Sequence, residues 1–129
     1  MRRTYRELIV TTPGLSESIS GAILYDETIR KQKNDGTPFA KAIADAGIVP
    51  RIEVDTGAKS LAGRPGEKIT EGLDGLRDRL AEYSQMGARF AKWCVVIAIG
   101  EAMPTLGCIE ANANALARYA ALCQEAGLG

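Results

Sequence analysis

The sequence contains no histidine among its 129 residues, so it lacks the side chain that most often acts as an acid or base near neutral pH and most often gives zinc a nitrogen ligand. Any chemistry must use Lys, Asp, Glu, Tyr or Cys. Net charge is also absent, because 16 Lys and Arg balance 16 Asp and Glu, and this gives no support to a nucleic acid or an anionic membrane as partner. No apolar run approaches the roughly 20 residues that span a bilayer.

Cysteine is scarce as well. Cys94, Cys108 and Cys123 are odd in number and show no CxxC spacing, which favours reduced thiols in a cytoplasmic protein. The N-terminal residues 1–7 are too charged for the start of a secretory signal. We expect neither a metal nor a cofactor.

The composition is that of a folded globular protein, with 46% apolar and 25% charged residues. We expect residues 1–129 to form a single domain, although a complete (β/α)₈ barrel is about twice this length.

Helices and strands are predicted to alternate. In order they are a helix at 2–11, a strand at 19–25, a helix at 38–46, a strand at 48–55, a helix at 70–86, a strand at 90–97 and a helix at 109–126. The Gly- and Pro-rich stretch 56–67 is predicted to be a loop. This alternation predicts an α/β fold with about three parallel core strands and right-handed crossovers.

Three parallel strands would leave two unpaired sheet edges and one uncovered face. We therefore expect the chain to self-associate, with a dimer as the favoured state.

Four polar residues have a geometric reason to converge. Glu53 and Asp55 share one face of the second strand, because successive side chains of a strand alternate. Lys92 and Cys94 share one face of the third strand in the same way. If the alternating apolar residues face the helices, these four meet near the strand ends, where α/β barrels keep their active sites. The alternative is that Lys92 only forms an ion pair with Asp55 or Glu53 and binds no substrate, which is the commoner case in an arbitrary α/β domain.

Other candidates are weaker. The glycines of 57–66 lack the Gly-Lys-Ser/Thr ending of a phosphate-binding loop, Cys94 has no histidine to act as its base, and Trp93 is predicted to pack in the core. Arg79 and its neighbours on the 70–86 helix are predicted to form a solvated face.

Several segments carry a family resemblance. They are Arg2–Leu8 (RRTYREL), Ile19–Leu24 (ISGAIL), Asp35–Phe39 (DGTPF), Thr70–Leu76 (TEGLDGL), Gly87–Trp93 (GARFAKW) and Glu110–Ala120 (EANANALARYA). In their order and spacing they resemble class I fructose-bisphosphate aldolase, and the similarity covers essentially the whole chain.

The resemblance implies part of a (β/α)₈ TIM barrel, its second to fourth βα units. It also implies a glycolytic lyase that cleaves fructose 1,6-bisphosphate to dihydroxyacetone phosphate and glyceraldehyde 3-phosphate through a lysine Schiff base, without a metal. The family's Schiff-base lysine would correspond to a position after Gly129, so these residues are not expected to perform the cleavage unaided. Two alternatives stay open: a non-catalytic, self-associating scaffold, and a weak carbon–carbon lyase in which Lys92 itself forms the imine.

Three residues take roles from the resemblance. Lys92 matches an active-site lysine that contacts the substrate, Asp55 matches an aspartate of the barrel interior, and Arg2 matches an arginine that binds a phosphate of the sugar. A phosphorylated sugar is thus the implied partner.

Two positions depart from the family pattern, since Glu53 stands in place of a lysine and Cys94 in place of an arginine. The exchange removes two cations near a phosphate site. A phosphate within about 4 Å of Glu53 would be repelled by about 4 kcal/mol at an effective dielectric of 20, so we expect weakened bisphosphate binding. Alternatively, Glu53 serves to neutralise Lys92.

Overall fold

The computed structural model describes residues 2–129, and the side chains from Thr4 onward. Its helices are α1 (Arg2–Val10), the 3₁₀ turn η1 (Leu15–Glu17), α2 (Asp26–Ile29), α3 (Phe39–Asp45), α4 (Leu76–Gln85) and α5 (Leu106–Glu125). Its strands are β1 (Gly21–Leu24), β2 (Val49–Glu53), β3 (Gly57–Ser60), β4 (Lys68–Glu71) and β5 (Phe90–Lys92).

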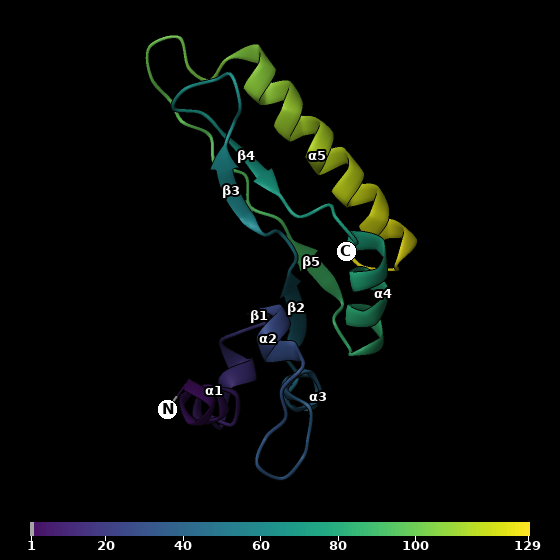
Figure 1. Ribbon diagram of the computed structural model, residues 1–129. Helices are drawn as coiled ribbons and strands as arrows, with labels where there is room; N and C mark the ends of the chain where they lie inside the picture. The colour runs from purple at the N-terminus through teal and green to yellow at the C-terminus, as the bar shows by residue number, and fades with distance from the viewer. Residues whose placement is uncertain (1) are drawn as a thin grey trace.

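A three-stranded parallel sheet in the order β1-β2-β5 organises the fold (Figure 1). Its register places Ile23 opposite Arg51, and Glu53 opposite Lys92. Gly129 continues the same pattern at the far edge of β5, because it accepts a hydrogen bond from the Ala91 amide at 2.9 Å and donates one to the Arg89 carbonyl at 3.1 Å. The predicted mixture of helices and parallel strands is therefore confirmed.

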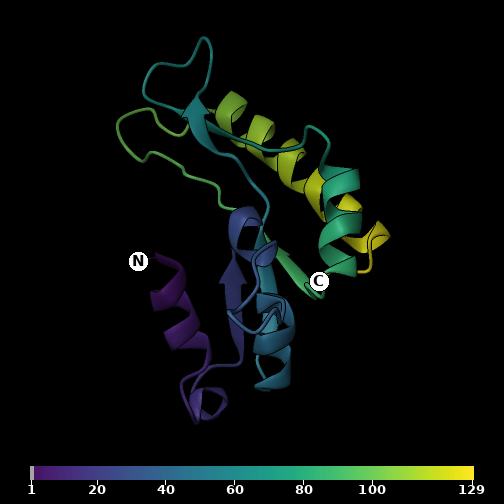
Figure 2. The same ribbon diagram turned by 60° about the horizontal axis from the view of Figure 1, so that its bottom comes forward.

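One face of the sheet is covered by helices. Ile52 of β2 and Val54, which directly follows β2, are buried. They share a core with residues of α3, α4 and the end of α5. Figure 2 shows α4 and α5 together on one side of the molecule, with α1 on the opposite side. The other face carries the residues that alternate with the core set, and its apolar members Ile23 and Val49 are 44% and 39% exposed.

The segment between β2 and α4 differs from the prediction. Residues 56–67 were expected to be a loop and residue 70 to begin a helix, but β3 and β4 pair as an antiparallel hairpin and α4 begins at Leu76. Gly72 and Gly75 have φ values of 137° and 62°, which no right-handed helix contains. The hairpin is held from outside by α5, whose Asn112 side chain accepts a hydrogen bond from the Thr70 amide and donates one to the Lys68 carbonyl.

Other observed helix and strand ends also differ from the predicted ones. The third strand was expected to reach residue 97, but its ladder ends at Lys92, and beyond it the Cys94 carbonyl accepts a hydrogen bond from the Thr70 hydroxyl at 2.7 Å. The one-turn helix α2 was not predicted. The last helix begins three residues earlier than predicted, because Thr105 caps it by accepting a hydrogen bond from the Cys108 amide.

A helix must be both long and apolar to cross a bilayer. Among the described residues, no helix combines the two properties that crossing a bilayer requires.

Candidate functional site

Glu53 and Lys92 form an ion pair on the uncovered face of the sheet. The parallel register places them side by side at the carboxyl ends of β2 and β5. The Lys92 ammonium nitrogen lies 2.8 Å and 3.0 Å from the two carboxylate oxygens of Glu53. The Lys92 side chain is 37% exposed and that of Glu53 only 12%. A molecule in solvent can therefore reach Lys92 more easily than it can reach its partner.

The ion pair changes the acid–base behaviour of Lys92. Hydrogen bonding to the Glu53 carboxylate raises the pKa of Lys92 above its ordinary value, against a smaller opposing effect of burial. The side chain is thus a protonated ammonium at neutral pH. In that state it can attract an anion or donate hydrogen bonds, but it has no free lone pair with which to attack a carbonyl.

Asp55 organises the backbone just beyond the two strands. One carboxylate oxygen accepts a hydrogen bond from the Cys94 amide at 3.0 Å, and the other accepts one from the Gly57 amide at 3.0 Å. Asp55 therefore fixes the end of β2, the start of β3 and the chain after β5 relative to one another. The structure brings Asp55 to the same strand ends as Lys92, but the ion-pair partner of Lys92 is Glu53.

Cys94 and Arg2 are the remaining predicted site residues. Cys94 lies beside the pair in sequence and its thiol is exposed. The side chain of Arg2 lies outside the described residues, so its assignment to phosphate binding stays a prediction.

A cavity of about 480 Å³ adjoins Glu53 and Asp55. Its remaining lining comes from the β1–α2 junction, the start of the hairpin segment and α4, and consists of Tyr25, Asp26, Arg30, Val54, Thr56, Asp74, Arg79 and Tyr83. Polar groups of both signs line it, with four carboxylates and two guanidinium groups.

Arg30 is already engaged in this cavity. Its guanidinium group lies 2.8 Å from Asp26 and 2.7 Å from Glu82, so it bridges α2 and α4. Burial opposes the ionisation of Asp26, but hydrogen bonds from Arg30 and Tyr83 hold the pKa of Asp26 below its ordinary value. Asp26 is thus an anion at neutral pH.

Arg79 was predicted to lie on a solvated helix face, and this prediction was wrong. Its guanidinium group donates to the Val54 carbonyl at 3.0 Å and to the Gly72 carbonyl, which ties α4 to the end of β2. The sequence held one signal for this, because Arg79 lies three residues after the buried Leu76 and one before the buried Leu80.

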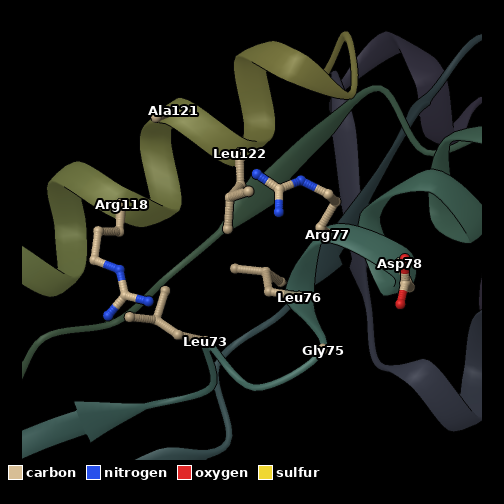
Figure 3. A pocket seen from close by; sticks show the side chains of 8 residues that line it. All are labelled: Leu73, Gly75, Leu76, Arg77, Asp78, Arg118, Ala121 and Leu122. Atoms are coloured by element: carbon tan, nitrogen blue, oxygen red, sulfur yellow. The ribbon is translucent and has the colours of Figure 1, made fainter.

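A second hollow lies between α4 and α5, away from the predicted residues. Figure 3 shows Leu73, Leu76 and Leu122 forming its floor, with Arg118 at one end and Arg77 at the other. Arg77 is paired with Glu125 at 2.6 Å. None of the residues predicted to take part in chemistry lines this hollow.

Carboxylates and thiolates are the side chains of this protein that could ligate a metal ion. Within the part of the chain whose side chains are described, no group of three or more such residues is arranged to hold a metal ion.

Comparison with known proteins identifies the family. The family model for glycolytic class-I fructose-bisphosphate aldolase matches residues 1–129. The chain belongs to this family. It is 69% identical over 127 residues to a probable class 1 fructose-bisphosphate aldolase of Xanthomonas campestris pv. campestris, and 51% identical over 127 residues to the cytosolic fructose-bisphosphate aldolase 6 of Arabidopsis thaliana.

The aldolase relatives are much longer than this chain. Each alignment covers 98% of the chain, but only 38% of the Xanthomonas protein and 36% of the Arabidopsis protein. A crystal structure of Plasmodium falciparum fructose-bisphosphate aldolase, in complex with TRAP and a small-molecule inhibitor, superposes with a TM-score of 0.92 at 43% identity, over 98% of this chain and 37% of that one. The chain therefore corresponds to a segment of about 38% of an aldolase, and it has the mixed α/β structure of that segment.

Proposed function

We propose that these residues form the part of a class I fructose-bisphosphate aldolase that presents Lys92 to a phosphorylated sugar, and that this segment does not cleave the sugar without the rest of the enzyme. The observation that carries the proposal is the position of Lys92, at the carboxyl end of a parallel strand on the face away from the helices. In α/β barrels, catalytic residues occupy this position.

The proposal includes a partial (β/α)₈ barrel with three core strands, built by a single domain over residues 1–129. Two observations support it. The strands of the sheet neighbour one another in chain order, from β1 to β2 to β5. Gly129 forms backbone hydrogen bonds along the outer edge of β5. The face that carries Lys92 is then the barrel interior.

Three residues are proposed to act on the substrate side. Lys92 contacts the substrate as a cation, Arg2 contacts a phosphate, and Asp55 supports the chemistry from the strand ends. The hydrogen bonds of Asp55 to the Cys94 and Gly57 amides favour a positioning role, because both of its oxygens already accept from the backbone. The chain is also proposed to work in an oligomer in the cytoplasm; the exposed Ile23 and Val49 support association, and a dimer is the favoured state.

An independent Lys92-dependent lyase is disfavoured by the raised pKa of that residue. The imine requires the neutral amine, and the Glu53 carboxylate stabilises the ammonium. Borohydride reduction with dihydroxyacetone phosphate should therefore leave no covalent adduct on Lys92 in the 129-residue polypeptide. The polypeptide should also show no cleavage of fructose 1,6-bisphosphate in a coupled assay. Turnover that disappears in Lys92→Ala would contradict this part of the proposal.

A chimera tests the positive part. Residues 1–129 would replace the matching segment of the Xanthomonas relative, and cleavage would be measured beside the unmodified relative. We expect activity that is reduced in the chimera, largely recovered by Glu53→Lys with Cys94→Arg, and lost on Lys92→Met in the recovered form. A recovered chimera that folds but is indifferent to Lys92→Met would refute the assignment of Lys92.

A further inference from the structure

The uncovered face of the sheet carries a second cation, Arg51. The strand register places Arg51 between Ile23 of β1 and Phe90 of β5, two residues before Glu53 on the same face. The Arg51 residue is half-buried, and its Nε atom is enclosed without a hydrogen-bond partner. Within the part of the chain whose side chains are described, its guanidinium group has no hydrogen bond and no ion pair.

Packing holds this guanidinium group in place. The Arg51 Cζ atom lies 3.7 Å from the centre of the Phe90 ring, so the guanidinium group stacks on the ring. It also lies against Gly21, where a Cβ atom would come within 2.4 Å of the Arg51 Nε atom. A side chain that is already held in this way loses little conformational freedom when it binds an anion.

Glu53 does not neutralise Arg51, although it is close in sequence. Both oxygens of Glu53 lie within 3.0 Å of the Lys92 ammonium nitrogen. The three side chains Arg51, Glu53 and Lys92 together therefore carry one net positive charge. A guanidinium group binds phosphate through hydrogen bonds as well as through charge, so a phosphate is a ligand that this excess charge favours.

The carboxylates near this face gather toward the other end of the strands. Asp55 follows β2 and lines a cavity together with Glu53, Asp26 and Asp74. Arg51 precedes Glu53 by two residues, which is about 6.6 Å toward the amino end of the strand. Because electrostatic repulsion falls with distance, these carboxylates repel a phosphate at Arg51 less than one at the carboxyl ends of the strands.

Arg51 and Lys92 are close enough to contact one small ligand. Adjacent strands lie about 4.8 Å apart and two residues along a strand span about 6.6 Å, so the Cα atoms of Arg51 and Lys92 lie about 8 Å apart. Both side chains rise from the same face. A sugar whose hydroxyl or carbonyl groups contact Lys92 can therefore place a phosphate at Arg51.

We propose that Arg51 is a specificity-determining residue of the uncovered face, where its guanidinium group binds a phosphate of the sugar that Lys92 contacts. The inference rests on the proposed function, which places Lys92 against a phosphorylated sugar. It adds the residue that selects the phosphorylated form. Fructose 1,6-bisphosphate carries two phosphates, so Arg51 and Arg2 can each bind one.

The test measures binding to the full 129-residue chain, labelled with ¹⁵N, by titration of its amide resonances. Dihydroxyacetone phosphate and dihydroxyacetone are the probes, because they differ in the phosphate alone. Arg51→Met removes the charge and keeps a long side chain that can cover Phe90. Arg118→Met is the matched control, because Arg118 is exposed on α5, which packs on the covered side of the sheet. Circular dichroism checks that each variant is folded.

We expect the parent to bind dihydroxyacetone phosphate more tightly than dihydroxyacetone. Arg51→Met should weaken binding of the phosphate ester at least tenfold, which is about 1.4 kcal/mol, with little change for dihydroxyacetone. Arg118→Met should change neither. The inference is overturned if Arg51→Met binds the phosphate ester as the parent does, or if the parent does not distinguish the two probes.

Gly21→Ala is a second variant, and it keeps the charge of Arg51. The added methyl group would occupy space that the guanidinium group now fills, so the Arg51 side chain must move. We expect a folded chain that binds the phosphate ester more weakly and dihydroxyacetone as before. Phosphate ester binding equal to that of the parent would overturn the inference, because the phosphate would then not depend on where the guanidinium group lies.

Failure of the proposed function has a different signature. Lys92→Met should weaken binding of both probes, since Lys92 contacts the part of the sugar that they share. Dihydroxyacetone is uncharged, so its weaker binding cannot come from the Glu53 carboxylate that this variant sets free. If dihydroxyacetone binds Lys92→Met as it binds the parent, the proposed function falls and the inference falls with it. If Lys92→Met weakens both probes but Arg51→Met weakens neither, the inference alone is refuted.

Discussion

Asn112 is predicted to be the main attachment of the β3–β4 hairpin to α5. Its side chain is 2% exposed, accepts from the Thr70 amide at 3.3 Å and donates to the Lys68 and Cys108 carbonyls at 2.9 Å and 3.0 Å. Replacement by alanine leaves the Thr70 amide and the Lys68 carbonyl without this partner. A buried polar group that loses its partner costs about 1–3 kcal/mol, so the two together should lower the free energy of unfolding by about 2–6 kcal/mol.

The measurement is urea-induced unfolding followed by circular dichroism, with thermal unfolding beside it. For a chain of this length the loss corresponds to a fall in melting temperature on the order of 10 °C. Asn114→Ala is the control, because Asn114 lies two residues further along the same helix and is exposed; it should change stability by less than about 0.5 kcal/mol. An equally small effect of Asn112→Ala would refute the reasoning, since it would mean that the hairpin does not depend on this amide.

Two further predictions concern a close backbone approach and a buried acid. Gly72→Ala should lower the free energy of unfolding in urea by about 2–4 kcal/mol, because the residue has φ 137° and a Cβ would lie 2.9 Å from Asp55 Cα. The control is Gly36→Ala, which has φ 84° and open space around it and should cost about 1 kcal/mol. Equal costs for the two variants would contradict the steric argument. Hydrogen bonds from the hydroxyl and amide of Thr105 hold the pKa of Glu67 below its ordinary value. The contribution of the Glu67 carboxylate to stability is therefore complete above about pH 4.3 and is lost as the pH falls through the folded-state pKa. Between pH 5 and pH 3 the parent should therefore lose more stability than Glu67→Gln, and parallel losses would count against the role of this carboxylate.

The two faces of the parallel strands could be predicted because side-chain alternation is a local pattern. Alternating side chains in 48–55 and 90–97 separate a core face from a polar face, and the structure places Ile52 in the core and Glu53 and Lys92 on the other face. The pairing of Lys92 with an acid was likewise among the predicted alternatives. The alternation pattern did not determine which acid pairs with Lys92. Strand register determines it, because Glu53 lies directly opposite Lys92 while Asp55 lies beyond the last paired residues of β2 and β5.

The hairpin could not be predicted from its own residues. Residues 56–67 contain turn-forming glycines, and 70–76 read as the start of a helix, but the backbone of β4 is held by an asparagine 42 positions away from Thr70. The role of Arg79 was missed for the same reason, since its partners are backbone carbonyls of other segments, which no spacing of side chains reveals.

Family membership, the α/β class and the two polar strand ends follow from residues that are close together in the chain, because side-chain alternation and motif spacing are local properties. The hairpin, the bridging arginines and the choice of Glu53 as the partner of Lys92 arise only when distant segments meet. Those contacts depend on register and on backbone groups that every residue shares, so the order of side chains alone does not specify them.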